Sequence, residues 1–200
     1  GHMQYGFQTI SGSTYYFDST YGTMQTGWQT IDGNRYYFYS DGKMAKNTMI
    51  DAYVISSDGV AILDEAYQGA YKILNQVGWD LRSAYNWSAN LRYVNYSNNP
   101  SPGSKNFAIH GFQTNTGDCY VMAATFYYMA KALGYDAHQM AGYVPLRRGG
   151  LGVHSWVEID MDGSTYVFDP DFTHEAKRNG YQITYGMSGT WKYSNYYRMN

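Results

Sequence analysis

The stretch GDCYVMAATFYYMAKALGY, residues 117 to 135, carries the only cysteine of a 200-residue chain. Asp118 is a residue type that caps helix N-termini, and the apolar run that follows ends at Gly134, a common helix stop. The stretch therefore predicts a helix from Asp118 to Leu133 with Cys119 in its first turn. Unpaired amides and the positive end of the helix dipole stabilise a thiolate there. A buried structural cysteine is the alternative for a lone Cys.

A second stretch, VHSWVEIDMDGSTYVFDPDF (Val153 to Phe172), predicts two strands joined at Asp162-Gly163, a two-residue hairpin signal. In this register Val157 faces Phe168. Because side chains alternate between the two faces of a strand, this pair lies on an apolar side of the ribbon. We expect that side to pack on the cysteine helix or the core.

The other side of the predicted ribbon carries polar residues. His154 lies directly opposite Asp171 and diagonal to Asp169, so an imidazole and a carboxylate can meet there. A directly opposed carboxylate is nearer, whereas a diagonal one can take the far ring nitrogen and leave the near one free. A helix N-terminal thiol, a histidine and an orienting carboxylate are the elements of thiol acyl-transfer catalysis.

Three further motifs accompany the cysteine stretch: AGYV (Ala141 to Val144), HSWVEI (His154 to Ile159) and YVFDP (Tyr166 to Pro170). Together they resemble the transglutaminase-like superfamily over roughly residues 105 to 172. The resemblance implies a papain-like core of the α+β class. It also implies Cys119 as nucleophile, His154 as general base and acid, and Asp169 as the carboxylate that orients His154. An inactive relative that keeps these residues for packing is the alternative.

The resemblance does not select one reaction, because related domains cross-link glutamine to lysine, hydrolyse peptide or amide bonds, or have lost activity. The active ones share an acyl-enzyme whose oxyanion needs donors, and the backbone amide of Cys119 is the first candidate. Gln113 lies at the spacing of the oxyanion glutamine of papain-type proteases, although an ordinary loop residue is the alternative. One cysteine without a second Cys or His nearby is a weak zinc signal even beside His154 and Asp169. We therefore expect no metal and no cofactor.

The first third of the chain repeats itself. GFQTISGSTYYFDSTYGTM (Gly6 to Met24) is followed by GWQTIDGNRYYFYSDGKM (Gly27 to Met44), and a degenerate third copy, MIDAYVISSDGV (Met49 to Val60), reads as a terminal cap. Aromatic residues and turn signals predict one hairpin per copy. A single hairpin is marginal in water, so we expect successive copies to stack as solenoid repeats do.

This pattern is similar to the cell-wall-binding repeats of secreted Gram-positive proteins, the choline- and glucan-binding modules, over about residues 4 to 60. The resemblance implies a surface-attachment module whose aromatic clefts hold a choline cation or a sugar face. Packing alone is the alternative role for the same rings. The expected ligand-binding residues are Phe7, Tyr15, Tyr16, Trp28, Tyr36 and Tyr37.

The chain is thus expected to consist of β-hairpin repeats at residues 1–60 and a transglutaminase-like catalytic domain at 61–200. Helical spacing is found from Leu63 to Trp79 and from Asp80 to Val94. The segment from Asn95 to Asn106 is expected to be an ordered surface loop or a flexible connection. The tyrosine-rich tail, Tyr181 to Met199, forms either a closing strand or a wall of the cleft.

A net charge of −2 and a pI near 6.2 provide no basic field for nucleic acid. The longest apolar run, Val121 to Ala130, is far shorter than the roughly 20 residues of a membrane span. The leading hypothesis is a secreted, cell-wall-associated thiol acyltransferase or hydrolase acting on peptide or protein amides, either a transglutaminase or a cysteine protease. Its expected partners are a cell-wall glycan or choline-bearing polymer and a peptide substrate. The alternative is a non-catalytic choline- or glycan-binding surface protein with a degenerate transglutaminase-like domain.

Overall fold

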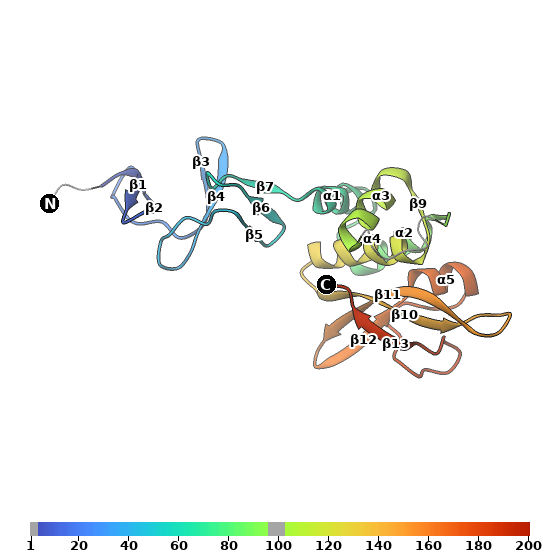
Figure 1. The fold of residues 1–200 in the computed structure, drawn as a ribbon. Coiled ribbons are helices and arrows are strands. Elements are labelled where there is room, and N and C mark those ends of the chain that lie inside the picture. Colours follow the sequence, from blue (N-terminus) through green and yellow to red (C-terminus); the bar gives the residue numbers. More distant parts are fainter. Residues whose placement is uncertain (1–3, 96–102) are drawn as a thin grey trace. The chain divides into compact units, whose positions relative to one another are not determined.

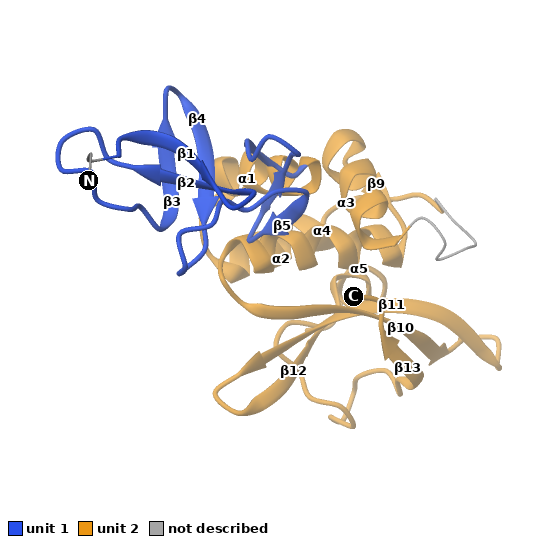
Figure 2. Ribbon diagram, turned by 60° about the vertical axis from the view of Figure 1, so that its left-hand side comes forward, with its two compact units in different colours: residues 1–64 blue, residues 65–200 orange. Residues whose placement is uncertain are grey.

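The computed structural model describes residues 4–95 and 103–200, and the chain divides into two compact units, residues 1–64 and 65–200 (Figures 1 and 2). The first is called the repeat unit below, and the second the α+β unit. The boundary expected from sequence, between residues 60 and 61, lies just before the division between these units. Among the described residues, no helix combines the length and the apolar character needed to cross a membrane.

The repeat unit is a series of antiparallel hairpins. Its strands are β1 (Gly6–Ile10) with β2 (Ser13–Phe17), β3 (Gly27–Ile31) with β4 (Asn34–Phe38), and the three-stranded sheet β5 (Thr48–Ile50), β6 (Tyr53–Ile55) and β7 (Ala61–Leu63). The turn at Asp32 and Gly33 has φ values of 49° and 80°, the left-handed conformation that a two-residue hairpin turn requires. The hairpin predicted for each repeat is therefore confirmed.

Alternation of side chains explains how the hairpins stack. Phe7 pairs with Tyr16, and Trp28 with Tyr37, so each pair occupies one face of its hairpin. The ring of Tyr36, on the other face of the second hairpin, lies 5.2 Å from the ring of Phe7. One face of each repeat thus meets the opposite face of the next, and the rings form the contact between successive repeats.

The α+β unit places helices on one side of a four-stranded antiparallel sheet (Figure 1). The sheet order is β12 (Ser164–Phe168), β11 (Leu151–Met161), β10 (Asp136–Pro145) and β13 (Ser194–Arg198). The helices are α1 (Glu65–Val77), α2 (Leu81–Ala89), α3 (Gly103–Thr114), α4 (Cys119–Ala132) and α5 (Pro170–Ala176). Two short strands, β8 (Arg92–Tyr93) and β9 (Thr116–Gly117), pair in parallel. The α+β class expected from sequence is confirmed.

Helix α4 is the centre of this unit. Every residue from Cys119 to Phe126 is buried, and α1, α2 and α3 pack against the helix. Val157, Ile159 and Phe168 of the β11–β12 hairpin belong to the same core, with Val157 opposite Phe168 as predicted. Helix α4 therefore packs between the other helices and the sheet. This packing holds its N-terminus in a defined position.

One expectation changes at the edge of these elements. The loop expected from Asn95 to Asn106 lies partly outside the described residues, at 96–102, and its last residues form the first turn of α3 instead. Phe107 is fully buried, and its ring lies 5.4 Å from that of Tyr120 on α4. Packing against α4 thus outweighs the turn-forming composition of this segment, and the loop prediction was wrong there.

Candidate active site

Cys119 is the first residue of α4, and two local features hold it there. Asp118 caps the helix, accepting hydrogen bonds from the amides of Tyr120 and Val121 at 3.1 and 3.3 Å. The parallel pair β8–β9 fixes the approach of the chain, because Tyr93 lies beside Gly117. The thiol side chain is only 9% exposed and lies in the wall of a cavity of about 460 Å³.

His154, on β11, lines the same cavity, and Asp169 holds its ring. Nε2 of His154 lies 2.8 Å from Oδ2 of Asp169. That oxygen also accepts a hydrogen bond from the hydroxyl of Tyr193 at 2.8 Å, and Oδ1 accepts one from the amide of Phe172 at 2.9 Å. Because Asp169 is fully buried and its oxygens are engaged, it has one orientation, which leaves Nδ1 of His154 available on the other side of the ring.

Asp171 is the second carboxylate at the site, and its position differs from the sequence-based expectation. Strand β12 ends at Phe168, Asp169 is the N-cap of α5, and Asp171 lies in the first turn of that helix. Pro170 has no N–H to continue the ladder and has the φ of a helix start. The expectation that Asp171 lies directly opposite His154, with Asp169 diagonal to it in the same ladder, was therefore wrong.

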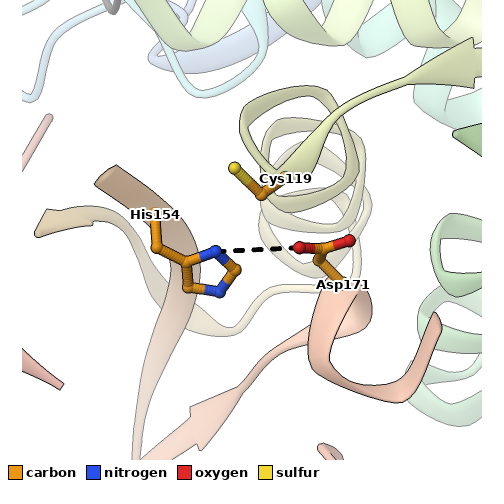
Figure 3. Close-up of side chains that lie close together, drawn as sticks. All are labelled: Cys119, His154 and Asp171. Carbon is orange, nitrogen blue, oxygen red and sulfur yellow. Dashed lines mark ion pairs between the residues drawn. The ribbon is translucent and has the colours of Figure 1, made fainter. Parts of the chain in front are cut away.

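The side chains of Cys119, His154 and Asp171 nevertheless converge, as Figure 3 shows. The sulfur, a ring nitrogen and a carboxylate oxygen of the three residues all lie within 4.8 Å of one another. Oδ2 of Asp171 lies 3.7 Å from Nδ1 of His154, beyond the length of a hydrogen bond. His154 therefore has Asp169 hydrogen-bonded to one nitrogen, and Cys119 and Asp171 near the other.

Burial and charge act in opposite directions on the ionisable groups here. Burial alone lowers the pKa of His154, but the charge of Asp169 and its hydrogen bond outweigh that, with a smaller contribution from Cys119, so that the pKa lies well above its usual value. Burial raises the pKa of the Cys119 thiol, whereas the hydrogen bond and charge of His154 act to lower it. Burial also raises the pKa of Asp171 to about 7. Asp169 therefore stabilises a proton on the ring of His154, which suits a base that takes up the proton of the nearby thiol.

The tail of the chain completes the cavity in two ways. Trp191 lines it and lies edge-on to the ring of His154, with centroids 4.8 Å apart, while Tyr193 donates to Asp169. Strand β13 then pairs with β10 at the edge of the sheet. The two sequence-based alternatives for this tail, a closing strand and a cleft wall, are thus both realised by successive residues. Leu146 and Arg147, in the loop between β10 and β11, line the cavity as well.

Gln139 connects the nucleophile helix to the strands. Its Nε2 donates to the carbonyl of Tyr120 and to Oγ of Ser155, each at 3.0 Å. Ser155 directly follows His154 on β11, and its hydroxyl donates to the carbonyl of Met140. This fully buried network therefore links the first turn of α4 to the strand segment that carries His154.

The structure places Gln113 away from the proposed reaction centre. This residue lies near the end of α3, where its side chain is exposed and its Nε2 donates to Glu65 at 3.4 Å. The described residues that line the cavity beside Cys119 do not include Gln113. The oxyanion role considered for it is therefore not supported, and neither is the loop alternative, because Gln113 is helical. The backbone amide of Cys119, which has no acceptor within α4, stays the candidate donor.

The aromatic residues of the repeat unit form two clusters. The first aromatic cluster consists of Phe7, Tyr16 and Tyr36, with Phe7 at 4.9 Å from Tyr16 and 5.2 Å from Tyr36. Tyr15 pairs with Gln8, on the opposite face of its hairpin. Five of the six expected ligand-binding residues therefore lie in an aromatic cluster, and Tyr15 faces away from the first.

The second aromatic cluster consists of Trp28, Tyr37 and Tyr53, and it already contains a cation. The rings of Tyr37 and Tyr53 lie 5.1 and 5.0 Å from Trp28. The guanidinium carbon of Arg35 lies 4.5 Å from the ring centres of both Trp28 and Tyr53, and Nη1 donates to the Tyr53 hydroxyl at 2.7 Å. The sequence analysis missed both Arg35 and Tyr53. The 21-residue spacing of the repeats could have pointed to Arg35, because it stands where the first copy has Thr14.

Comparison with known proteins agrees with the division into a repeat unit and an α+β unit. The family model described as the transglutaminase-like superfamily matches residues 68–170, just over half of the chain. A choline-binding repeat model matches residues 25–54, and a cell wall binding repeat model matches residues 6–20. No match was found among curated proteins.

Similar solved structures include CbpJ and choline binding protein F of Streptococcus pneumoniae, at 36% and 34% identity, each with a TM-score of 0.29. Each covers 30% of this chain, which spans only 20% of theirs. A candidate cysteine protease from Cytophaga hutchinsonii, at 17% identity and a TM-score of 0.42, covers 68% of this chain and is matched over 48% of its own length.

Proposed function

Because this chain belongs to the transglutaminase-like superfamily, we propose that its α+β unit is a thiol acyltransferase or hydrolase that acts on peptide or protein amide bonds. The observation that carries the proposal is the arrangement at the cavity. A cysteine at a helix N-terminus lies beside a histidine whose far nitrogen is held at 2.8 Å by a buried carboxylate. The catalytic residues proposed are Cys119, His154 and Asp169.

The proposed reaction follows from the ring orientation. Nδ1 of His154 takes the proton of the Cys119 thiol, and the thiolate attacks the amide carbonyl carbon, forming a C–S bond. The imidazolium then gives its proton to the departing nitrogen as the C–N bond breaks, which leaves a thioester. An amine or water next attacks the thioester, His154 takes the proton of the attacking group, and the C–S bond breaks to restore Cys119.

Each remaining group has a role in the same steps. Asp169 keeps Nε2 of His154 protonated and stabilises the imidazolium that forms, as carboxylates do in related triads. The backbone amide of Cys119 points out of the helix N-terminus and donates to the oxyanion of the tetrahedral intermediate. The burial of Asp169 and His154 limits competing water around the ion pair.

Mass spectrometry tests this proposal most directly. The chain and its Cys119→Ala variant are incubated with cell-wall peptides and surface proteins, and products that need Cys119 are identified. Isopeptide bonds with loss of ammonia indicate transfer to an amine, whereas new termini indicate hydrolysis. If Cys119 also resists iodoacetamide until the chain is denatured, the enzyme proposal fails, and a non-catalytic surface protein becomes the better description.

We further propose that the repeat unit attaches the chain to a choline-bearing polymer or glycan of the cell wall, which makes the protein extracellular. The family matches to residues 6–20 and 25–54 support this, together with the exposed Phe7 and the partly buried Tyr16 and Tyr36 of the first aromatic cluster. A cation over an aromatic face contributes about 0.5 to 2 kcal/mol, so few repeats bind weakly.

Retention on a choline or glucan resin tests the attachment. Tyr16→Ala removes a ring of the first aromatic cluster and should reduce retention. Tyr21→Ala is the matched control, because Tyr21 belongs to the same repeat, is 77% exposed, and lies outside both clusters. Equal retention of the Tyr16→Ala variant and the wild type would contradict the proposal for this cluster.

A further inference from the structure

The cavity of the α+β unit contains a carboxylate that the proposed reaction does not use. Asp171 is 4% exposed, and its Oδ1 is buried without a hydrogen-bond partner among the described residues. Its Oδ2 faces His154 at 3.7 Å (Figure 3). A buried carboxylate in this state is costly, because it has lost water without gaining partners. A cation bound beside its Oδ2 would offset this cost.

We propose that Cys119, His154 and Asp171 form a binding site for Zn²⁺ or a similar thiophilic divalent cation, and that the bound cation blocks the nucleophile. A thiolate, an imidazole and a carboxylate are all zinc ligands. The inhibitory part of the inference rests on the proposed function, whereas the binding part does not.

The distances fit a cation between these side chains. Zn–N and Zn–O bonds of about 2.0 to 2.2 Å at a tetrahedral angle place the two ligand atoms roughly 3.3 to 3.6 Å apart. Nδ1 of His154 and Oδ2 of Asp171 are 3.7 Å apart, too far for a hydrogen bond but close to this separation. The sulfur of Cys119 lies within 4.8 Å of the other two ligand atoms, so a small side-chain movement completes three ligands.

The surroundings also match those of a zinc site. A histidine that binds zinc usually donates its other ring N–H to a carboxylate, which fixes the ring, and Asp169 already occupies that position at 2.8 Å. The three ligands line a cavity of about 460 Å³, which gives the ion a path and leaves a fourth position for water. The thiol proton, the Nδ1 proton of His154 where the ring is charged, and that of Asp171 where it is protonated pass to solvent when the metal binds.

Sequence reasoning weighed Asp169 as the third ligand and found the zinc signal weak. In the structure, Asp169 is hydrogen-bonded to Nε2, and Asp171 faces Nδ1 instead. A second group of possible ligands, Asp136, His138 and Asp160, lies at the other end of β10 and β11. Those side chains are partly exposed, and His138 already pairs with Asp136 at 3.3 Å, so this group serves as an internal control.

The test measures the 200-residue chain with ZnCl₂ alone. Isothermal titration gives zinc affinity and stoichiometry, and mass spectrometry gives the rate of Cys119 alkylation by iodoacetamide with and without zinc. We expect one zinc per chain at a site that Cys119→Ala removes. Alkylation should slow about tenfold or more at saturating zinc and recover with EDTA. Asp171→Asn should weaken zinc binding roughly 10- to 100-fold, and His138→Ala should leave it unchanged.

The outcomes separate this inference from the proposed function. Rapid, His154-dependent alkylation that zinc does not slow would leave the nucleophile in place and overturn the zinc site. Zinc affinity that is unchanged in Cys119→Ala or Asp171→Asn, or lost in His138→Ala, would also overturn it. If Cys119 does not react even without zinc, the proposed function fails, and the titration still decides the inference. Circular dichroism of Asp171→Asn verifies that any loss of binding occurs in a folded chain.

Discussion

The cavity of the α+β unit and the aromatic clusters of the repeat unit use side chains in opposite ways. Around Cys119, a few polar groups are buried, and the orientation of the His154 ring depends on one of them, Asp169, which is 0% exposed and hydrogen-bonded through both oxygens. In the first aromatic cluster, apolar rings stay accessible, with Phe7 at 42% exposure. The chemistry of the cavity therefore depends on single atoms, whereas the clusters offer surfaces that both pack and bind.

The difference implies that a single substitution in the cavity can change reactivity with little change in stability. A substitution in the aromatic clusters is expected to change ligand binding and stability together. Removing a charge from a buried carboxylate changes the reactivity of its partner while the shape is kept. Removing a ring from a cluster changes packing and binding together, because the same face of the ring does both. Substitutions at five positions follow, in order of decreasing expected effect.

Asp169→Asn is expected to have the largest effect. Asparagine keeps an oxygen for the amide of Phe172, so α5 stays capped, but it removes the negative charge that holds His154. We expect acyl-transfer activity to fall on the order of 10²-fold or more, and Cys119 alkylation near neutral pH to slow markedly. Alkylation kinetics followed by mass spectrometry measure the second effect.

Asp171→Asn is the matched comparison for that result. Asp171 lies two residues after Asp169, in the first turn of α5. Its carboxylate is near Nδ1 of His154 but is not hydrogen-bonded to the ring. A smaller loss of reactivity than in Asp169→Asn is expected. A larger loss than in Asp169→Asn would show that Asp171, not Asp169, orients the ring of His154.

Gln139→Ala tests whether the buried network positions the site rather than merely filling space. The substitution removes both buried hydrogen bonds that Nε2 donates and leaves a cavity, so the free energy of unfolding should fall by about 2 kcal/mol. Gln139→Glu keeps the volume but replaces the amide donor, and denaturant unfolding should show a comparable loss. Unchanged stability in both variants would show that the network contributes little.

Arg35→Ala sharpens the contrast within the repeat unit. The guanidinium fills the space between Trp28 and Tyr53, where an external cation would otherwise bind. Its removal should raise choline affinity by about fivefold, the equivalent of about 1 kcal/mol of cation–π energy. Choline titration followed by tryptophan fluorescence measures this change. Thr14→Ala, at the corresponding position of the first repeat, is the control, and a decrease in affinity for Arg35→Ala would overturn the expectation.

Asp18 is expected to show the smallest effect. Its carboxylate accepts hydrogen bonds from the amides of Thr20, Tyr21 and Thr23, and chiefly the bond from Tyr21 holds its pKa below the usual value. Since the folded pKa is lowered, this contribution to stability is present above the unfolded pKa near 3.8 and is lost as the pH falls through the folded value. An NMR titration of the Tyr21 amide should have its midpoint below 3.8, and Asp18→Asn should abolish it. A midpoint at or above 3.8 would show that these hydrogen bonds do not favour the carboxylate.

Local sequence patterns predicted much of this protein because the interactions concerned are short in range. The two-residue turn at Asp32-Gly33 defines its hairpin, and the 21-residue spacing of Phe7 and Trp28 marks the repeats. Asp118 caps a helix through amides two and three residues away. The cluster of Cys119, His154 and Asp169 was accessible through family resemblance, which carries long-range information that spacing alone does not.

Contacts between distant segments could not be read in the same way. Tyr193 reaches Asp169 only because the tail returns along β10, and Arg35 meets Tyr53 only because two repeats stack. Asp171 leaves its expected place opposite His154 because Pro170 starts a helix, which turns the carboxylate toward Nδ1. Such positions depend on how whole elements pack in three dimensions, and residue spacing along the chain carries no measure of that packing.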